Sequence, residues 1–256
     1  MKTNIYLILF TALIFSCQSP NAVQIDDSEW SGTISASDER NAIMNSFADA
    51  YENKDAEEIE KAISDKTKMI IINSPNNPSG SIYNEKELYE IASVIKKYPN
   101  VFVLSDEIYE HINYGTKHVS FASIEGMYDR TVTVNGIAKA FAMTGWRIGY
   151  LGAPIWIAKA CTKLQGQVTS GANCIAQRAT IDAITESPEK INYMVKEFEQ
   201  RRNLIIKLLS EIKGFQLNNP DGAFYIFPDK SIDGVSVSSP SCHLAGHTSS
   251  GLLWTY

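Results

Sequence analysis

The sequence predicts an α/β fold in which a mostly parallel sheet is flanked by helices. Short apolar and β-branched runs at residues 69–72, 101–104 and 131–134 are typical of buried strands, and segments with helical spacing of apolar residues alternate with them. Such alternation indicates a sheet whose faces are covered by helices. With 256 residues, 44 % of them hydrophobic, the chain is long enough to form a core. The net charge of −6 gives no reason to expect nucleic-acid binding.

The first 17 residues have the pattern of a secretory signal peptide. A lysine at position 2 precedes an apolar run over residues 5–15, which is short for a membrane span. The run ends in Ile-Phe-Ser-Cys, which is similar to the cleavage box of bacterial lipoproteins, so a lipid at Cys17 is the membrane attachment to expect. Residues 18–56 are interpreted as a polar tether followed by a helix over residues 38–51, whose origin the sequence does not identify.

Four helices are predicted between residues 55 and 184. Asp55 and Glu58 have the spacing of a capping box for a short first helix. The second covers residues 86–97, and the third and fourth cover residues 154–165 and 173–184. The inward face of the second helix is expected to consist of Leu88, Ile91, Ala92 and Ile95.

A fifth, longer amphipathic helix is predicted to begin at Ser187. Ser187 suits the N-cap, Pro188 suits the first turn, and Gly214 suits the position past the end. The expected apolar face consists of Ile191, Val195, Phe198, Ile205, Leu208, Leu209 and Ile212.

The cysteines do not indicate a metal site. Cys161 and Cys174 lie in helix-like segments without CxxC spacing, and we expect buried free thiols. Free thiols suit a reducing compartment, whereas the leader indicates export. Cys242, His243 and His247 have no second cluster to complete a metal site, so no metal is expected.

Residues suited to cofactor chemistry follow the strand-like runs. Lys139 precedes Arg147 by eight positions, and a lysine amine can condense with an aldehyde while an arginine fork can grip a phosphate. Because α/β enzymes place ligands beyond the carboxyl ends of strands, the layout favours one shared site. The segments concerned are residues 73–80, 105–110, 138–150 and 222–228.

Each motif also has a structural alternative when it is taken alone. Lys139 could be a solvated chain segment, and Arg147 could pair with a surface carboxylate. Asp106 and Tyr109 could be an acid at a helix entry and a packing aromatic. The Asn-Pro-Ser-Gly turn at residues 77–80 needs no ligand to be stable. Four such motifs in this order are improbable as structural accidents.

Together the four segments resemble the class I/II (fold type I) aminotransferases that depend on pyridoxal 5′-phosphate (PLP), in particular those similar to aspartate aminotransferase. The turn Asn-Pro-Ser-Gly resembles their Asn-Pro-Thr-Gly, residues 106–109 resemble their Asp-Glu-x-Tyr, and residues 138–150 resemble their Schiff-base lysine segment. Residues 222–228 look like the strand that opens their small domain. The likeness runs from about residue 57 to about residue 230.

The resemblance implies a domain organisation. Residues 57–214 would form the central part of the PLP-binding large domain with the interdomain helix, residues 215–230 the start of a truncated small domain, and residues 231–256 an irregular tail. The strands near residues 70, 102, 132 and 149 would be consecutive neighbours in the middle of a seven-stranded sheet. The sheet formed by these four strands would then have two apolar edges without partners, which favours aggregation.

The resemblance also implies PLP as the cofactor and a role for five residues. Lys139 would form the Schiff base and then move the substrate proton. Asp106 would keep the ring nitrogen protonated, Asn77 and Tyr109 would bond the ring oxygen O3′, and Arg147 would grip the phosphate. Two features depart from the family pattern. An alanine precedes Lys139 where many relatives have serine, and no late arginine is present to bind the substrate carboxylate.

The implied function is transfer of an amino group between an amino acid and a 2-oxo acid. Members of the family are usually cytoplasmic and form homodimers, whereas the leader suggests an exported, lipid-anchored protein, so the sequence leaves localisation open. The alternatives are an inactive exported lipoprotein or relic fragment that retains the motifs, and a cofactor-binding module that acts through a partner chain. The sequence does not identify the amino acid that serves as substrate.

Overall fold

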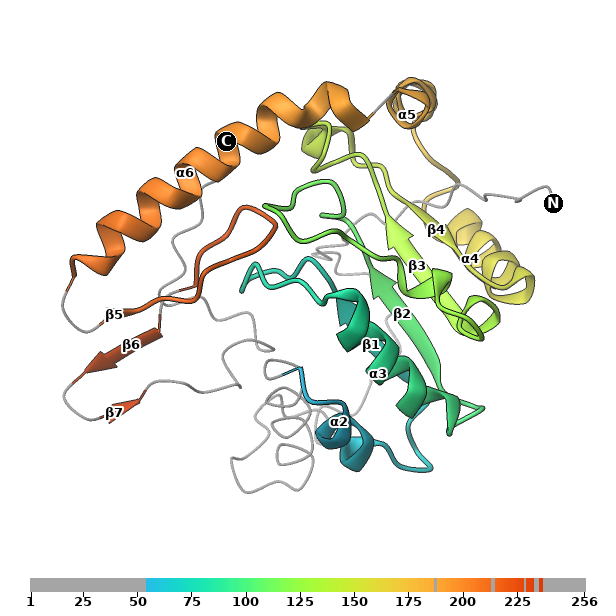
Figure 1. The fold of residues 1–256 in the computed structure, drawn as a ribbon. Coiled ribbons are helices and arrows are strands. Elements are labelled where there is room, and N and C mark those ends of the chain that lie inside the picture. Colours follow the sequence, from blue (N-terminus) through green and yellow to red (C-terminus); the bar gives the residue numbers. More distant parts are fainter. Residues whose placement is uncertain (1–53, 187, 213–214, 228, 233–234, 237–256) are drawn as a thin grey trace, which may run out of the picture.

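The computed structural model describes residues 54–186, 188–212, 215–227, 229–232 and 235–236 (Figure 1). The predicted signal peptide, the tether and the helix over residues 38–51 lie outside the described residues. The same is true of most of the predicted tail, including Cys242, His243 and His247.

Four strands form the central sheet. They are β1 (Met69–Asn73), β2 (Phe102–Asp106), β3 (Thr131–Asn135) and β4 (Tyr150–Gly152), and they lie side by side in that order. The pairs β1–β2 and β2–β3 are parallel, and β3–β4 is antiparallel. The prediction of four consecutive neighbours in a mostly parallel sheet is therefore confirmed. In the described part of the chain, β1 pairs only with β2 and β4 only with β3.

The parallel register brings the carboxyl ends of the strands to one edge of the sheet. Asn73, the last residue of β1, pairs with Asp106, the last residue of β2, and Asp106 pairs with Val134 of β3. The loops that follow these three strands therefore start close together. They carry the residues that the sequence singled out.

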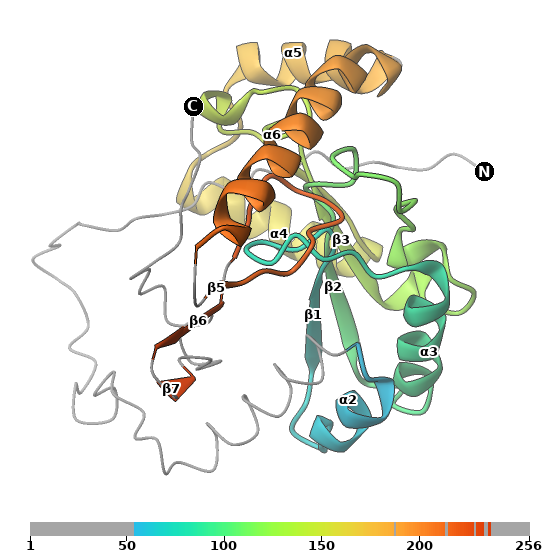
Figure 2. The ribbon, with the colours of Figure 1, turned by 60° about the vertical axis from the view of Figure 1, so that its left-hand side comes forward.

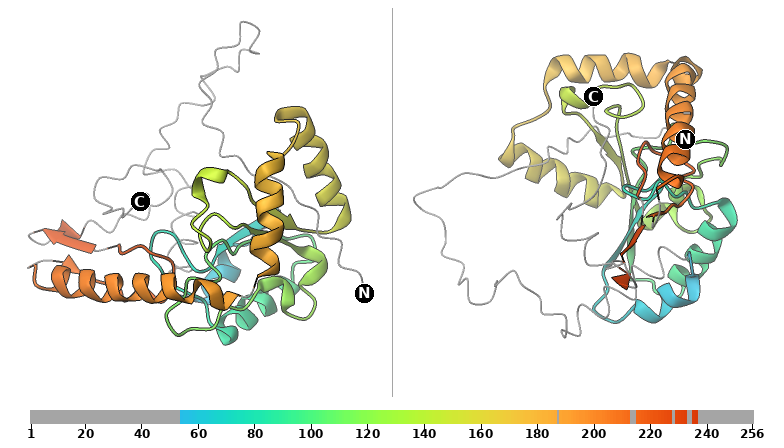
Figure 3. Two further views of the ribbon diagram at one scale, coloured as in Figure 1. Left: turned by 90° about the horizontal axis from the view of Figure 1, so that it is seen from above. Right: turned by 90° about the vertical axis from the view of Figure 1, so that its left-hand side faces the viewer.

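Helices cover both faces of the sheet. Helices α2 (Ala56–Ala62) and α3 (Glu85–Lys96) lie on one side, and α4 (Ile155–Val168) lies on the other, as the turned views show (Figures 2 and 3). The larger core cluster lies beneath α2 and α3. On the α4 side, Trp156 meets Phe102 of β2 edge-on, with ring centroids 5.6 Å apart. All four predicted inward residues of α3 are buried: Leu88, Ile91, Ala92 and Ile95.

The capping residues explain where α2 and α3 begin. Asp55 caps α2 by accepting hydrogen bonds from the backbone N–H groups of Glu57 and Glu58, as expected for an N-cap. The Glu58 carboxylate contacts Lys61 instead of the N-cap backbone, so this part of the capping-box prediction is not reproduced. A reciprocal capping box is present in α3, between Asn84 and Glu87.

The long helix begins later than predicted. Residues Pro188–Ile191 form a 3-10 turn, and the α-helix α6 covers Asn192–Ser210. Its predicted apolar face is buried at Ile191 and Leu209, but Leu208 is 49 % exposed. Only one side of α6 faces the rest of the described chain (Figure 1), which explains why an amphipathic pattern predicts more burial than is found.

The segment predicted as a strand at residues 222–228 is not one. Its described residues, 222–227, form a turn followed by non-strand backbone, and Ala223 has a φ of +56°. Their backbone N–H groups bond to loops instead of a strand: Gly222 donates to Gly80 O (2.8 Å) and Ala223 donates to Ile112 O (2.8 Å). The C-terminal strands are β5 (Phe215–Gln216), β6 (Asp229–Ile232) and β7 (Val235–Ser236).

The two described cysteines are free thiols, as predicted. Cys161 is half-buried beside Leu151 and Ala158, but Cys174 is exposed, so the expectation of burial is wrong there. Cys174 is the first residue of α5 (Cys174–Thr185), whose inward positions are Ala176, Thr180 and Ala183. No described helix combines the length and apolar character that crossing a bilayer requires.

Candidate active site

The candidate site is built from loops that leave the carboxyl edge of the sheet. The turn after β1 is fixed by the Asn76 side chain, whose Oδ1 accepts from Ser79 N (3.0 Å) and Ser79 Oγ (2.7 Å). Asn73 Oδ1 accepts from the backbone N–H of Asn77 (2.8 Å). Gly80 closes the turn at a φ of +71°, a conformation that glycine adopts without strain.

Asp106 ends β2, and Tyr109 stands near the start of the loop that follows. Asp106 is half-buried, and its Oδ1 accepts a hydrogen bond from Ile108 N (3.2 Å). Burial raises the pKa of Asp106, and the neighbouring Glu107 charge adds to that effect, whereas the bond from Ile108 opposes it. In the part of the chain that the structure describes, Asp106 has no cationic side chain as an ion-pair partner.

Tyr109 is buried, with its side chain 2 % exposed, and its hydroxyl is the meeting point of three segments. Burial raises the pKa of Tyr109 strongly, and contact with the Tyr225 hydroxyl and the charge of Asp106 raise it further. The Asn77 side chain, which reaches the same hydroxyl, acts in the opposite direction. Asn77, Asp106 and Tyr109, three of the residues singled out in the sequence, therefore lie together.

Lys139 follows β3 and enters the same group. Its Nζ lies 5.8 Å from the ring centroid of Tyr109 and 5.6 Å from that of Phe224, so the amine lies against both aromatic rings. Burial lowers the pKa of Lys139, and the charge of Arg147 lowers it further. Within the described residues, Lys139 makes no ion pair with a carboxylate.

Arg147 ends the short 3-10 turn Thr144–Trp146 and has a φ of +51°. It is exposed, and one guanidinium nitrogen donates to the carbonyl oxygen of Thr144 (3.0 Å), which leaves further N–H donors. Arg147 and Trp146 also border an open hollow of about 600 Å³ beside the start of α5. Lys139 is not among the residues that line this hollow.

Phe224 and Tyr225 were missed as site residues because sequence reasoning placed them in a strand. The Tyr225 hydroxyl lies 2.5 Å from the Tyr109 hydroxyl. Phe224 meets Tyr109 edge-on at 5.4 Å and stacks on Phe198 of α6 at 5.2 Å. The only sequence signal for them was two adjacent aromatic residues after a glycine, which is common in packed segments. Their contact with Tyr109 depends on the fold of a loop more than one hundred positions away in the sequence.

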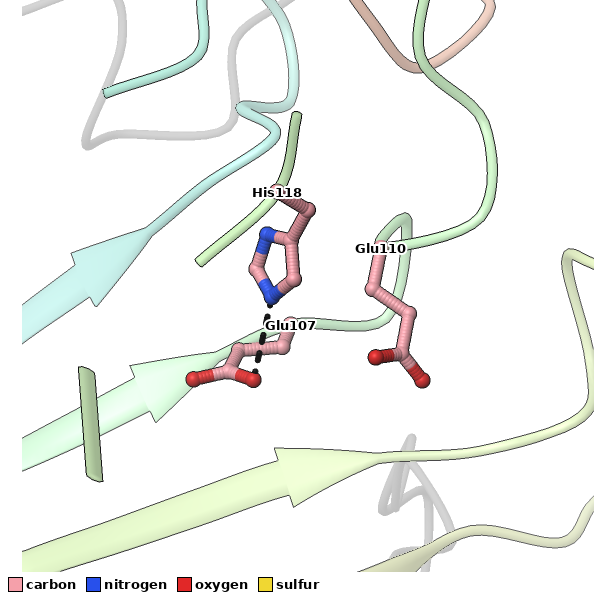
Figure 4. A group of neighbouring side chains, drawn as sticks. All are labelled: Glu107, Glu110 and His118. Atoms are coloured by element: carbon pink, nitrogen blue, oxygen red, sulfur yellow. Dashed lines mark hydrogen bonds and ion pairs between the residues drawn. The ribbon is translucent and has the colours of Figure 1, made fainter. Parts of the chain in front are cut away.

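Among the described residues, one group of potential metal ligands lies beside the candidate site, and the sequence did not indicate it. Glu107, Glu110 and His118 each place one ligand atom within 4.8 Å of the others (Figure 4). The Glu107 carboxylate is already engaged, since it accepts from Ser105 Oγ (2.8 Å), Ser120 Oγ (3.0 Å) and Phe121 N (3.2 Å), and His118 Nε2 lies 3.2 Å away. These bonds satisfy a buried carboxylate without an ion, so we assign the group a structural role.

Comparison with known proteins places this arrangement in context. The family model described as aminotransferase class I and II matches residues 7–236. A bifunctional aspartate aminotransferase and glutamate/aspartate-prephenate aminotransferase of Petunia hybrida is 47 % identical over 184 residues, which are 70 % of this chain and 38 % of that protein. A probable aspartate/prephenate aminotransferase of Rhizobium leguminosarum bv. phaseoli is 46 % identical over 187 residues, or 72 % of this chain and 47 % of that protein.

Solved structures agree with the sequence relatives. The aspartate aminotransferase of Rhizobium meliloti superposes with a TM-score of 0.67 at 40 % identity, covering 68 % of this chain and 44 % of that one. The aromatic aminotransferase of Pyrococcus horikoshii superposes with a TM-score of 0.66 at 41 % identity, covering 70 % and 49 %. The fold is thus the central part of a fold type I large domain, as the sequence predicted.

The matches cover most of this chain but only part of each relative. The chain spans less than half the length of the curated relatives that it matches. The family match begins at residue 7, about fifty positions before the likeness expected from the sequence. A match over residues 7–236 covers most of the 256 residues, and the chain belongs to the class I and II aminotransferase family.

Proposed function

We propose that this chain binds PLP through Lys139 and takes part in moving an amino group between an amino acid and a 2-oxo acid. The observation that carries the proposal is the convergence of Asn77, Asp106, Tyr109 and Lys139, from three separate loops, at one edge of the sheet. Arg147 is close enough for its charge to act on Lys139. The side chains come from the carboxyl ends of strands, where α/β folds hold ligands.

The residues present fit PLP in their chemistry. When bound, PLP supplies an aldehyde for an amine and a protonated ring that withdraws electrons from the substrate. The Lys139 amine has a pKa below its ordinary value, because of burial and the charge of Arg147, so more of it is neutral and nucleophilic near neutral pH. A neutral amine can bind the aldehyde and can later take a proton from the substrate carbon.

Asp106 suits the position opposite the ring nitrogen. A half-buried carboxylate whose burial disfavours its charge is stabilised by a nearby cation, and in the described part of the chain no side chain supplies one. A protonated ring nitrogen is such a cation. Asp106 would hold the proton on that nitrogen by the same interaction.

The remaining groups would orient the cofactor. Tyr109 and Asn77 present a hydroxyl and an amide to the same point and would bond the ring oxygen O3′. Arg147 keeps unused guanidinium donors, whose planar fork suits a phosphate. The aromatic faces of Tyr109 and Phe224 limit where the Lys139 amine can move and keep water from part of its surroundings.

The substrates and the assembly are also proposals. We infer that aspartate is the amino donor to test first, because the relatives from Petunia hybrida and Rhizobium leguminosarum carry aspartate in their names. We propose a homodimer on the same grounds of family membership.

Transfer of an isotope-labelled amino group tests the proposed function. The full chain is mixed with PLP, labelled aspartate and a 2-oxo acid, and label in the new amino acid is measured by mass spectrometry. We expect transfer by the wild type and none by Lys139→Ala. Lys163→Ala removes an exposed lysine of α4 and serves as the matched control, with transfer unchanged. Equal transfer by Lys139→Ala, or none by the wild type, would contradict the proposal, and the second result would favour an inactive relic.

A further inference from the structure

The Tyr109 hydroxyl has a partner that the proposed function does not use. Its oxygen lies 2.5 Å from the hydroxyl oxygen of Tyr225, and the two rings meet edge-on with centroids 5.7 Å apart. Either hydroxyl can be the donor in this pair. A hydroxyl has one proton to donate and can accept two hydrogen bonds, so the direction of this bond decides where the Tyr109 proton points.

The pair is held by an anchored segment. Backbone N–H groups of Asp221 and Gly222 donate to Gly80 O (2.9 and 2.8 Å) in the turn after β1. Ala223 N donates to Ile112 O (2.8 Å), and the Tyr114 hydroxyl donates to Ala223 O. The segment that carries Tyr225 is thus attached to both loops that carry Asn77 and Tyr109, which fixes the separation of the two hydroxyls.

Close packing around Gly222 leaves this segment little space for another backbone conformation. A methyl group added at Gly222 would lie 2.8 Å from Ile82 Cδ1 and 2.9 Å from Ile112 O, so the backbone there is in close contact on two sides. Phe224, the neighbour of Tyr225, is stacked on Phe198 of α6. The hydroxyl pair is therefore a built feature of three packed elements, since both tyrosines belong to segments fixed by backbone hydrogen bonds.

From this geometry we propose that Tyr225 is a positioning residue that directs the Tyr109 proton toward bound PLP. In the chain without PLP, Asn77 reaches the Tyr109 oxygen, and the Tyr109 and Tyr225 hydroxyls form a hydrogen bond in which either can be the donor. With PLP present, Tyr225 donates to Tyr109, and Tyr109 is then free to donate to the ring oxygen O3′. The inference rests on the proposed function, because it assigns Tyr225 a part in the same PLP site.

The two consecutive hydrogen bonds, from Tyr225 to Tyr109 and from Tyr109 to O3′, form a relay that changes the pH at which bound PLP loses its proton. A hydroxyl that accepts one hydrogen bond becomes a stronger donor in the next, so Tyr225 strengthens the bond from Tyr109 to O3′. A hydrogen bond to the deprotonated oxygen favours that form and lowers the pH at which bound PLP loses its proton. Without the Tyr225 hydroxyl, this pH should be higher.

Two measurements on the full chain test the proposal with Tyr225→Phe. The first uses NMR of the PLP-free chain with tyrosine labelled at Cζ, which reports exchange of each hydroxyl proton. We expect the Tyr109 proton to exchange about tenfold faster in the variant, since one hydrogen bond of about 1.4 kcal/mol is lost. The second is the pH titration of the visible absorbance after PLP is added. We expect its midpoint to rise by about half a pH unit or more.

Tyr114→Phe is the matched control, because it removes a hydroxyl that holds the same segment through Ala223 O and is bonded there rather than to the Tyr109 hydroxyl. A loosened segment would shift the PLP titration in both variants, whereas the proposed relay shifts it only in Tyr225→Phe. Unchanged Tyr109 exchange, an unchanged midpoint, or equal shifts in both variants would overturn the proposal. Absence of PLP binding by the wild type would overturn the proposed function and the relay toward PLP. In that case the exchange measurement, which uses the PLP-free chain, would still show whether Tyr225 holds the Tyr109 proton.

Discussion

Lys139 occupies surroundings that disfavour its charged form. Its amine is partly removed from water between Tyr109 and Phe224, and Arg147 adds a like charge. Both effects lower the pKa of a lysine, and the described residues provide no carboxylate to oppose them. The amine at this position is therefore easier to deprotonate than that of an exposed lysine.

The contribution of Arg147 can be measured by removing its charge. Because burial and the positive charge of Arg147 lower the pKa of Lys139, the neutral amine appears below the ordinary lysine range as pH rises. Arg147→Gln should raise this pKa, so that Lys139 is less neutral at a given pH. The pH dependence of Lys139 acetylation by a small anhydride, followed by peptide mass analysis, reports the midpoint without requiring PLP.

We expect the Lys139 midpoint to move to higher pH in Arg147→Gln, because a like charge that lowers the pKa is removed. Lys163 in α4 is the internal control, since its acetylation profile should be the same in both proteins. A Lys139 midpoint that stays in place or moves down in Arg147→Gln would show that Arg147 does not act on the amine.

At the scale of elements, the spacing of apolar residues predicted strands and helices, but it did not predict how the loops fold. Strands β1, β2 and β3 and the buried face of α3 follow from apolar runs and helical spacing, which depend on local sequence and one packed face. The strand near residue 149 was expected only from the family resemblance. The prediction of a strand at residues 222–228 was wrong because its composition does not reveal that the backbone N–H groups of Gly222 and Ala223 bond to carbonyl groups of two loops. The same limit hid the contact of Tyr225 with Tyr109, which needs the fold of two distant loops. The individual roles of the five predicted site residues came from the family resemblance.

The junction between the turn after β1 and residues 220–222 is a close contact that should govern the stability of the site. A methyl group at Gly80 would lie 2.3 Å from Pro220 Cβ and 2.9 Å from Gly222 O, and the φ of +71° adds backbone strain. Gly115 has a φ of +116° with open space around it, so Gly115→Ala introduces strain without a clash. Gly80→Ala should therefore lower the free energy of unfolding by at least about 1 kcal/mol more than Gly115→Ala.

Urea unfolding of the two alanine variants compares these losses. Equal losses in Gly80→Ala and Gly115→Ala would mean that the junction yields without cost, and the close packing of residues 220–222 on the turn would then have no part in stability.

At the scale of the whole molecule, the described chain leaves apolar surface without a cover. On β1 the side chains alternate, so that Ile70 and Ile72 are buried while Ile71, on the α4 side, is 59 % exposed. Trp156 on α4 is 62 % exposed. The chain spans less than half the length of its curated relatives. The exposed apolar side chains of β1 and α4 lie on elements that are shared with those relatives. The candidate site nevertheless has its lysine, its acid and its ring-oxygen groups in one place.

The central claim is that the Lys139 amine is placed to bind an aldehyde cofactor. The most direct test is to add PLP to the full chain, reduce with borohydride and locate the label by peptide mass analysis. The account predicts a single labelled peptide, the one that contains Lys139, at a pH where exposed lysines react little. Label spread over surface lysines, or no label at residue 139, would contradict it.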